Sequence, residues 1–292
     1  MARVGIVALV AAAACWGSTV VLIKISSRGL NVLGLTFIEL TAAVVLLGGA
    51  LLVRGRPLPR PSAGIVAAGL LEPGLSYPLI NAGLARTSGS HAALLLGAES
   101  VFVIAIAAAV LRVMPSRLVI VGSAIAFAGS ALLADGGGGA ATVTGDLLVL
   151  AGAVTSAGYV VMAHRLSDAT DPLTFTSYQF FVGWLVTLPV AVGVALFGHG
   201  HPFGTAQPRY VVAGVATGIV GSAMAFGLYN WALGRVSSAL AGTSLTLIPV
   251  FGIALSAIFL GEGLTVLTGI AGVAVLLGVI LARNGEAEVV NA

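Results

Sequence analysis

Three glutamates lie inside apolar segments of this chain, where an ionised side chain needs a partner or water. Glu39, Glu72 and Glu99 each fall within a run of mostly apolar residues. An ionisable group at the centre of a bilayer costs at least ~2.5 kcal/mol, so we expect these carboxyls to face a cavity or a partner. There they could bind an amino group or exchange protons. Alternatively, they pair with Lys24, with Arg86 or with an amide, or lie nearer the membrane surface.

Aromatic and amide side chains recur with the same spacing in two parts of the chain. Tyr77 and Asn81 stand four residues apart in one apolar segment, so they share a helical face. Phe226 and Asn230 repeat this pattern 149 residues later. Two aromatic–amide faces suit a central cavity, although hydrogen bonds between helices would also explain the asparagines.

Together these side chains predict a cavity in the middle of the membrane. His91 lies two turns before Glu99 on roughly the same helical face, and Trp16 lies deep in the first apolar segment. The residues that we expect to line the cavity are Trp16, Glu39, Tyr77, Asn81, His91, Glu99, Tyr159, Tyr229, Asn230 and Trp231.

Three prolines are expected to act as hinges. Pro73 and Pro78 lie in segment 62–85, and Pro249 lies in segment 239–260. A proline inside a helix removes a backbone hydrogen bond and bends the helix. A lipid-facing segment does not tolerate the freed carbonyl unsupported, so the bent segments should face protein or a cavity.

The residues needed for metal binding or for enzymatic chemistry are sparse. Cys15 is the single cysteine, and the four histidines are scattered apart from the pair His199 and His201. Neither an HExxH motif nor a Ser/His/Asp set falls within the apolar segments. We therefore expect no metal, no cofactor and no enzymatic activity.

Composition indicates an all-α protein that crosses a membrane many times. Hydrophobic residues make up 59% of the chain and charged residues only 8%, whereas a soluble domain averages about 25% charged residues. The net charge of +3 is then a matter of topology, and we expect no nucleic-acid partner. Ten segments have the roughly 20 apolar residues that a span requires. They are 4–23, 32–53, 62–85, 92–111, 117–134, 145–163, 173–197, 210–234, 239–260 and 264–282.

The distribution of basic residues predicts the orientation. With both termini in the cytoplasm, nine Lys and Arg residues lie inside and four outside, as the positive-inside rule favours. The expected location is the cell's inner membrane.

The two halves of the chain resemble each other. Residues 81–86 (NAGLAR) fall on residues 230–235 (NWALGR) at an offset of 149. Each half holds five predicted helices, an odd number, so the second half must enter the membrane from the opposite side. We expect a first repeat at 1–139, a second, inverted repeat at 140–283 and a polar cytoplasmic tail at 284–292. Inverted repeats are typical of transporters whose substrate site lies near the midplane.

Four motifs carry a resemblance to a known family. They are Trp16-Gly17-Ser18-Thr19 with Lys24, Tyr229-Asn230-Trp231-Ala232-Leu233, Pro249-Val250, and Leu260-Gly261-Glu262. With them the whole chain resembles the drug/metabolite transporter superfamily, in its ten-helix branch of EamA-type exporters, and is similar to the bacterial aromatic amino acid exporter group. The resemblance implies a monomer, surrounded by membrane lipid, that exports amino acids or related small metabolites by alternating access, with proton coupling left open. The alternative is an exporter of drugs and toxic compounds with the same fold.

Overall fold

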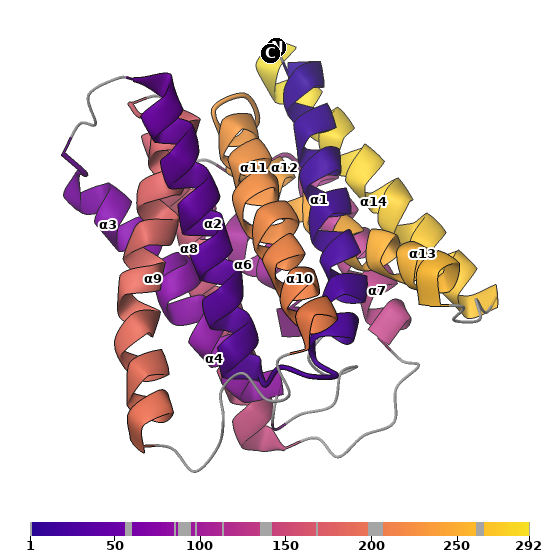
Figure 1. The fold of residues 1–292 in the computed structure, drawn as a ribbon. Helices are drawn as coiled ribbons and strands as arrows, with labels where there is room; N and C mark the ends of the chain where they lie inside the picture. Colours follow the sequence, from indigo (N-terminus) through magenta and orange to yellow (C-terminus); the bar gives the residue numbers. More distant parts are fainter. Residues whose placement is uncertain are drawn as a thin grey trace.

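The computed structural model describes residues 2–55, 60–84, 86, 95–96, 98–112, 114–134, 142–167, 169–197, 207–260 and 266–291. These residues form helices and no strands (Figure 1). The helices of the first half are α1 (Ala2–Ser26), α2 (Val32–Arg54), α3 (Ala63–Gly69), η1 (Leu70–Leu75), α4 (Ser76–Leu84), α6 (Glu99–Leu111) and α7 (Arg117–Ala134). Those of the second half are α8 (Val143–Leu166), α9 (Pro172–Phe197), α10 (Pro208–Thr217), η2 (Gly218–Met224), α11 (Ala225–Leu233), α12 (Ser238–Ser244), α13 (Leu247–Leu260) and α14 (Val266–Asn291).

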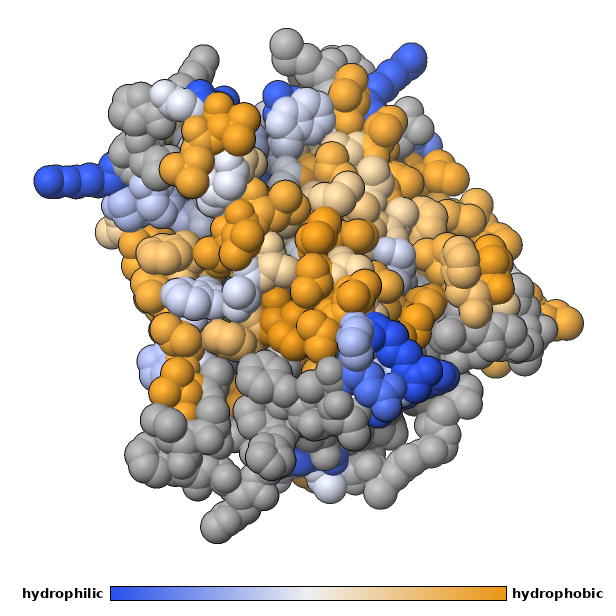
Figure 2. Space-filling view, viewed as in Figure 1, coloured by the Kyte–Doolittle hydropathy of each residue, from blue (hydrophilic) through white to orange (hydrophobic). Residues whose placement is uncertain are grey.

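Several of these helices are long and apolar enough to cross a membrane. Among the described residues, five helices meet both the length and the composition of a membrane span, namely Arg3–Ile23, Leu33–Arg54, Ala63–Ile80, Val143–Leu166 and Pro208–Leu233, and shorter apolar helices accompany them. Hydrophobic side chains cover most of the middle of the molecular face in Figure 2, and hydrophilic ones gather toward its ends. The chain is therefore a polytopic membrane protein.

Polar residues set the ends of these helices. The Asn31 side chain accepts a hydrogen bond from the Gly34 N–H at 2.8 Å and so caps the start of α2. The same helix ends at Gly55, whose positive φ of 62° suits a glycine. At the other end of the chain, α14 continues to Asn291, so the predicted polar tail extends the last helix rather than forming a separate segment.

The third predicted span is not one regular helix. It is interrupted by η1, where Glu72 has non-helical angles and the Glu72–Pro73 peptide bond is cis. A proline has no N–H to give to the preceding turn, so the regular pattern breaks there. Pro78 lies just beyond, in the first turn of α4.

The eighth predicted span has a matching interruption without a proline. Here η2 covers Gly218–Met224, which is the stretch that the 149-residue offset places on η1. Two glycines let η2 approach its neighbours: a Cβ at Gly218 would clash with the backbone of Glu39, and one at Gly221 would clash with Thr19. The backbone symmetry of the halves thus extends to their irregular turns.

The ninth predicted span is also divided, because α12 ends at Ser244 and α13 begins at Leu247. Two hydroxyls bond to backbone carbonyls there, Ser244 to Ala241 and Thr246 to Thr243, and such local bonds compete with helix continuation. Pro249 follows in α13; its side chain lies outside the described part of the structure.

Glycines join α7 to α14 in close contact. A Cβ added at Gly129 would lie only 2.8 Å from the Val275 backbone nitrogen. Small residues at such crossings let two helices approach closely in lipid, where packing rather than hydrophobic burial holds helices together.

Candidate functional site

A cavity of about 430 Å³ lies between the two halves of the molecule. Its wall is mostly apolar and aromatic, with hydroxyl and carboxyl groups at a few points. The lining residues are Trp16, Thr19, Ile23, Ser27, Leu30, Leu35, Thr36, Glu39, Glu72, Tyr77, Ile80, Leu96, Glu99, Ser156, Tyr159, Val160, Gly221, Phe226, Tyr229, Leu245 and Ile248.

Many of these residues occupy equivalent positions in the two halves. At the 149-residue offset, Tyr77 corresponds to Phe226 and Ile80 to Tyr229, and all four line the cavity. The pairs Glu72 and Gly221, Leu96 and Leu245, and Glu99 and Ile248 do the same. The cavity is therefore built from matching turns of the two halves.

Glu39 is held by a hydroxyl from the opposite half. The Ser222 Oγ donates a hydrogen bond to the Glu39 Oε1 at 2.7 Å. The Tyr77 hydroxyl lies 3.4 Å from the same Ser222 Oγ. This chain joins α2, η2 and α4 and fixes the direction in which the Glu39 carboxyl points.

The other two carboxyls, those of Glu72 and Glu99, lie around Ser156 of α8. The Ser156 Oγ donates to the Glu99 Oε1 at 2.9 Å. Glu72, which is only 4% exposed, lies near the hydroxyls of Ser156 and Ser76. Glu39, Glu72 and Glu99 all line this one cavity.

Glu39, Glu72 and Glu99 make the lining of the cavity acidic. Among the described lining residues, three are acidic and none is Lys, Arg or His. A carboxyl that is ionised in an apolar wall attracts a cation strongly because little water screens it. The geometry thus favours a ligand with an ammonium group and an apolar body.

Aromatic rings form the wall nearest the first helix. Trp16 meets Phe226 edge-on, with ring centroids 4.9 Å apart, and Tyr229 in the same way at 5.3 Å. Such arrangements are favourable between aromatic rings. Trp16 therefore joins the first half of the chain to the aromatic wall of the second.

Asn230 lies behind this wall, in a buried hydrogen-bond network. Its Oδ1 accepts a hydrogen bond from the Tyr159 hydroxyl. Its Nδ2 lies 2.9 Å from the Thr176 Oγ1 and 3.0 Å from the Gln179 Oε1, and donates to both. The network positions Tyr159, which does line the cavity.

The structure thus places the predicted cavity residues in three groups. Six line the cavity: Trp16, Glu39, Tyr77, Glu99, Tyr159 and Tyr229. Two lie elsewhere, Asn230 in the buried network and Trp231 beside an outer groove near the start of α1. The side chains of Asn81 and His91 fall outside the described residues.

Several lining residues lie outside the set that the sequence predicts for the cavity. Glu72 is one of the three intramembrane glutamates but not one of the predicted cavity residues; its place directly before Pro73 is the sequence signal that points to it. Ser156, which lines the cavity, and Ser222, which bonds to Glu39 but is not a lining residue, carried no such signal, because isolated hydroxyls are common in membrane helices and bond to their own backbone. Within the described residues, no group of three or more His, Cys, Asp or Glu could hold a metal ion.

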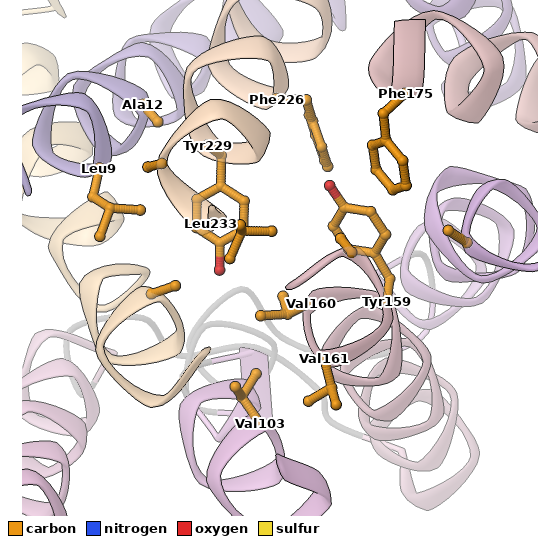
Figure 3. Packing of buried hydrophobic residues seen from close by; sticks show 14 of the residues in the cluster. Leu9, Ala12, Val103, Tyr159, Val160, Val161, Phe175, Phe226, Tyr229 and Leu233 are labelled. Atoms are coloured by element: carbon orange, nitrogen blue, oxygen red, sulfur yellow. The ribbon is translucent and has the colours of Figure 1, made fainter. Parts of the chain in front are cut away.

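Between the cavity and the end of the helix bundle at which α1 starts, apolar side chains pack together. We call Leu9, Ala12, Val103, Val161 and Leu233 the plug; all are at most 2% exposed (Figure 3). On each of the four helices that carry them, they lie further toward that end than the lining residues do. In the other direction the lining extends to Ser27 and Leu30.

Comparisons with known proteins agree with this architecture. The chain is 31% identical over 290 residues to a protein of Streptantibioticus cattleyicolor named "probable terminal-alkyne amino-acid exporter", with 96% of each chain covered. It is 26% identical over 273 residues to an uncharacterized transporter of Archaeoglobus fulgidus, covering 91% of this chain and 92% of that one. A crystal structure with 20% identity superposes with a TM-score of 0.83 over 98% of both chains, which shows a shared fold. The model of the EamA-like transporter family matches residues 3–134 and 143–283. The chain therefore belongs to the EamA-like transporter family and is a transporter rather than an enzyme.

Proposed function

We propose that this protein exports amino acids, or small metabolites that carry an amino group, across the cell's inner membrane. The observation that carries the proposal is the presence of Glu39, Glu72 and Glu99 in the wall of a mostly apolar and aromatic cavity. A substrate ammonium would pair with a carboxyl, and its side chain would contact Trp16 and Phe226.

The size of the cavity supports this substrate class. A volume of about 430 Å³ lies within the range of roughly 300–1,000 Å³ that is typical of small-molecule sites. The name of the Streptantibioticus relative supports an amino acid whose side chain is apolar and unsaturated. Such a side chain suits an aromatic wall.

The proposed mechanism is alternating access by two inverted five-helix repeats, residues 1–139 and 140–283, which together give ten membrane helices. The directions of the helices support the inversion. The Gly5 region at the start of α1 lies beside Val236, and His164 at the end of α8 contacts the Leu233 carbonyl 2.9 Å away. The first helix of one half therefore begins at the membrane face where the first helix of the other half ends (Figure 1).

In this mechanism the plug makes the described conformation the one that is closed toward the cytoplasm. With the termini in the cytoplasm, the plug separates the cavity from the cytoplasm, and the lining at Ser27 and Leu30 leads outward. Export requires a second conformation in which the plug helices part. The proposed bending points are the irregular turns η1, which contains Pro73 and is followed by Pro78, and η2, together with Pro249 in α13.

Flux measurements with purified protein in liposomes test the proposal. Wild type should show saturable counterflow of at least one amino acid from an aromatic and aliphatic panel. Glu39→Gln should raise the half-saturation concentration, because the amide cannot form an ion pair with the substrate. Asp146→Asn, in the first turn of α8 and outside the cavity lining, is the matched control and should leave flux unchanged. Absence of saturable flux across the panel would refute the amino acid assignment.

Export of amphipathic cationic drugs is the second candidate function, and the absence of a basic residue from the described lining favours it. An amino acid has a carboxylate of its own that needs a basic partner in the site, whereas a drug cation has none. Thermal shifts decide between the two, since a ligand that binds the folded state raises its melting midpoint. Stabilisation by drug cations, with none by amino acids, would favour the drug exporter.

Proton coupling is testable in the same liposomes. If the Glu72, Glu99 and Ser156 group exchanges a proton for each substrate, an imposed pH gradient should drive uptake against the substrate gradient. The variants Glu72→Gln and Glu99→Gln should then remove the response to pH. Equal rates with and without the gradient would indicate facilitated diffusion.

A further inference from the structure

A second hollow, of about 770 Å³, lies on the outside of the helix bundle near the start of α1. We call it the outer groove. Its walls come from α1, α2, α9, η2 and α11, and include Val7, Ala11, Leu47, Met224 and Leu228. Val7 and Met224 are among the exposed apolar side chains of the protein. In a membrane, this apolar surface meets hydrocarbon chains.

The outer groove is separate from the proposed substrate cavity. Among the described residues, none lines both hollows. Two of the plug's helices, α1 and α11, stand between them. An occupant of the outer groove would therefore be a different molecule from the substrate.

Charged and aromatic groups mark the mouth of the outer groove. Arg54, at the end of α2, forms an ion pair through its Nη1 with the Asp171 Oδ2, just before α9. Their side chains remain 34% and 38% exposed, so the pair is accessible from the groove. Trp231 also lines this end, with the Arg235 guanidinium 3.7 Å above its ring. Tryptophan and arginine near helix ends are typical of the level of the lipid headgroups.

We propose that the outer groove binds a phospholipid with a primary-amine headgroup, with one acyl chain along the apolar wall. The phosphate would bind Arg54, and the ammonium would bind Asp171. The Asp171 Oδ2 accepts hydrogen bonds from the Arg54 Nη1 and from the Thr174 N–H and hydroxyl. The ammonium would therefore bind the Asp171 Oδ1, and the phosphate the remaining N–H donors among the five of the guanidinium. Arg54 and Asp171 lie side by side, as do the phosphate and the ammonium of a zwitterionic headgroup.

The headgroup chemistry makes the proposal specific. A primary ammonium has three N–H donors for the Asp171 carboxylate. A choline headgroup carries the same charge without an N–H donor, and a glycerol headgroup carries no positive charge. Comparison with the choline lipid therefore tests the contribution of hydrogen bonding at equal charge. Comparison with the glycerol lipid tests the contribution of the positive charge, and binding common to all three lipids reflects the acyl chains alone.

Gly227 offers a way to fill the groove without disturbing the helices. It lines the groove on α11, and a Cβ built there meets nothing within 4 Å. A leucine at this position would extend into the space that the acyl chain needs. Gly272 on α14 is equally open but lies outside the groove, so Gly272→Leu is the matched control.

Native mass spectrometry of the full-length protein tests the proposal, with phosphatidylethanolamine, phosphatidylcholine and phosphatidylglycerol of identical acyl chains. Wild type should retain the ethanolamine lipid at least several-fold more than the other two. Asp171→Asn should remove the preference over the choline lipid, and Gly227→Leu should lower retention of all three. Gly272→Leu should behave as wild type. Equal retention of the three lipids by wild type, or unchanged retention by Gly227→Leu, would overturn the proposal.

Discussion

The position of Asn230 in a buried network leads to a prediction that separates structural from substrate-binding roles. Replacing Asn230 with leucine keeps a side chain of similar size but removes three hydrogen bonds, to Tyr159, Thr176 and Gln179. A hydrogen bond between membrane helices contributes ~0.6 kcal/mol on average and up to ~1.7 kcal/mol. Three such bonds give a loss of about 2 to 5 kcal/mol in the free energy of unfolding.

The assay is SDS titration in mixed micelles, followed by tryptophan fluorescence. A double-mutant cycle isolates one bond of the network. Tyr159→Phe should cost ~0.6 to 1.7 kcal/mol more in wild type than in the Asn230→Leu background, because the bond is already absent there. Thr155→Val is the control: its hydroxyl bonds to Gly152 of its own helix, and the variant should cost little.

Two results would refute this reasoning. If the effects of Tyr159→Phe and Asn230→Leu add within ~0.5 kcal/mol, the two side chains are not coupled. If Asn230→Leu keeps wild-type stability but loses substrate affinity, Asn230 contacts substrate directly, as the sequence alone predicted.

Three further predictions concern other parts of the molecule. Gly129→Leu should strongly lower stability in the same titration because α14 lies against that glycine, whereas Gly48→Leu, which meets nothing within 4 Å, should not. Trp16→Leu should cost ~1 to 3 kcal/mol through the loss of two edge-to-face contacts, measured by the same method. Burial raises the pKa of Asp171, but the hydrogen bonds from Arg54 and from the start of α9 outweigh it, so the pKa lies below its ordinary value of 3.8. The stabilisation from this carboxylate should therefore be complete above about pH 4 and decline as the pH falls further, so the melting midpoint of Asp171→Asn should converge on that of wild type in acid.

The sequence predicted the membrane-spanning class and much of the cavity, because apolar segments and a 149-residue repeat are visible in one chain. That offset paired Tyr77 with Phe226, and both line the cavity. The offset did not show that the Asn230 side chain points toward other helices of its own half. Helical spacing tells which residues share a face of a helix, but not which neighbouring helix that face contacts. The position of Glu72 depends on backbone that leaves the helix, and the role of Ser222 depends on Glu39 lying opposite. Both are products of tertiary structure.

The three carboxyls of the cavity all belong to the first half of the chain. At the matching positions the second half has Gly221 opposite Glu72 and Ile248 opposite Glu99, both in the cavity wall. A second offset, of 140 residues, places Val20-Val21 on Val160-Val161 and Glu39 on Gln179, a neutral residue within the Asn230 network. In the proposed alternating-access mechanism, a cationic substrate would consequently keep its ion pair with the first half while the second half moves past the apolar side of the substrate. Among the described lining residues, the acidic groups thus come from the first half alone.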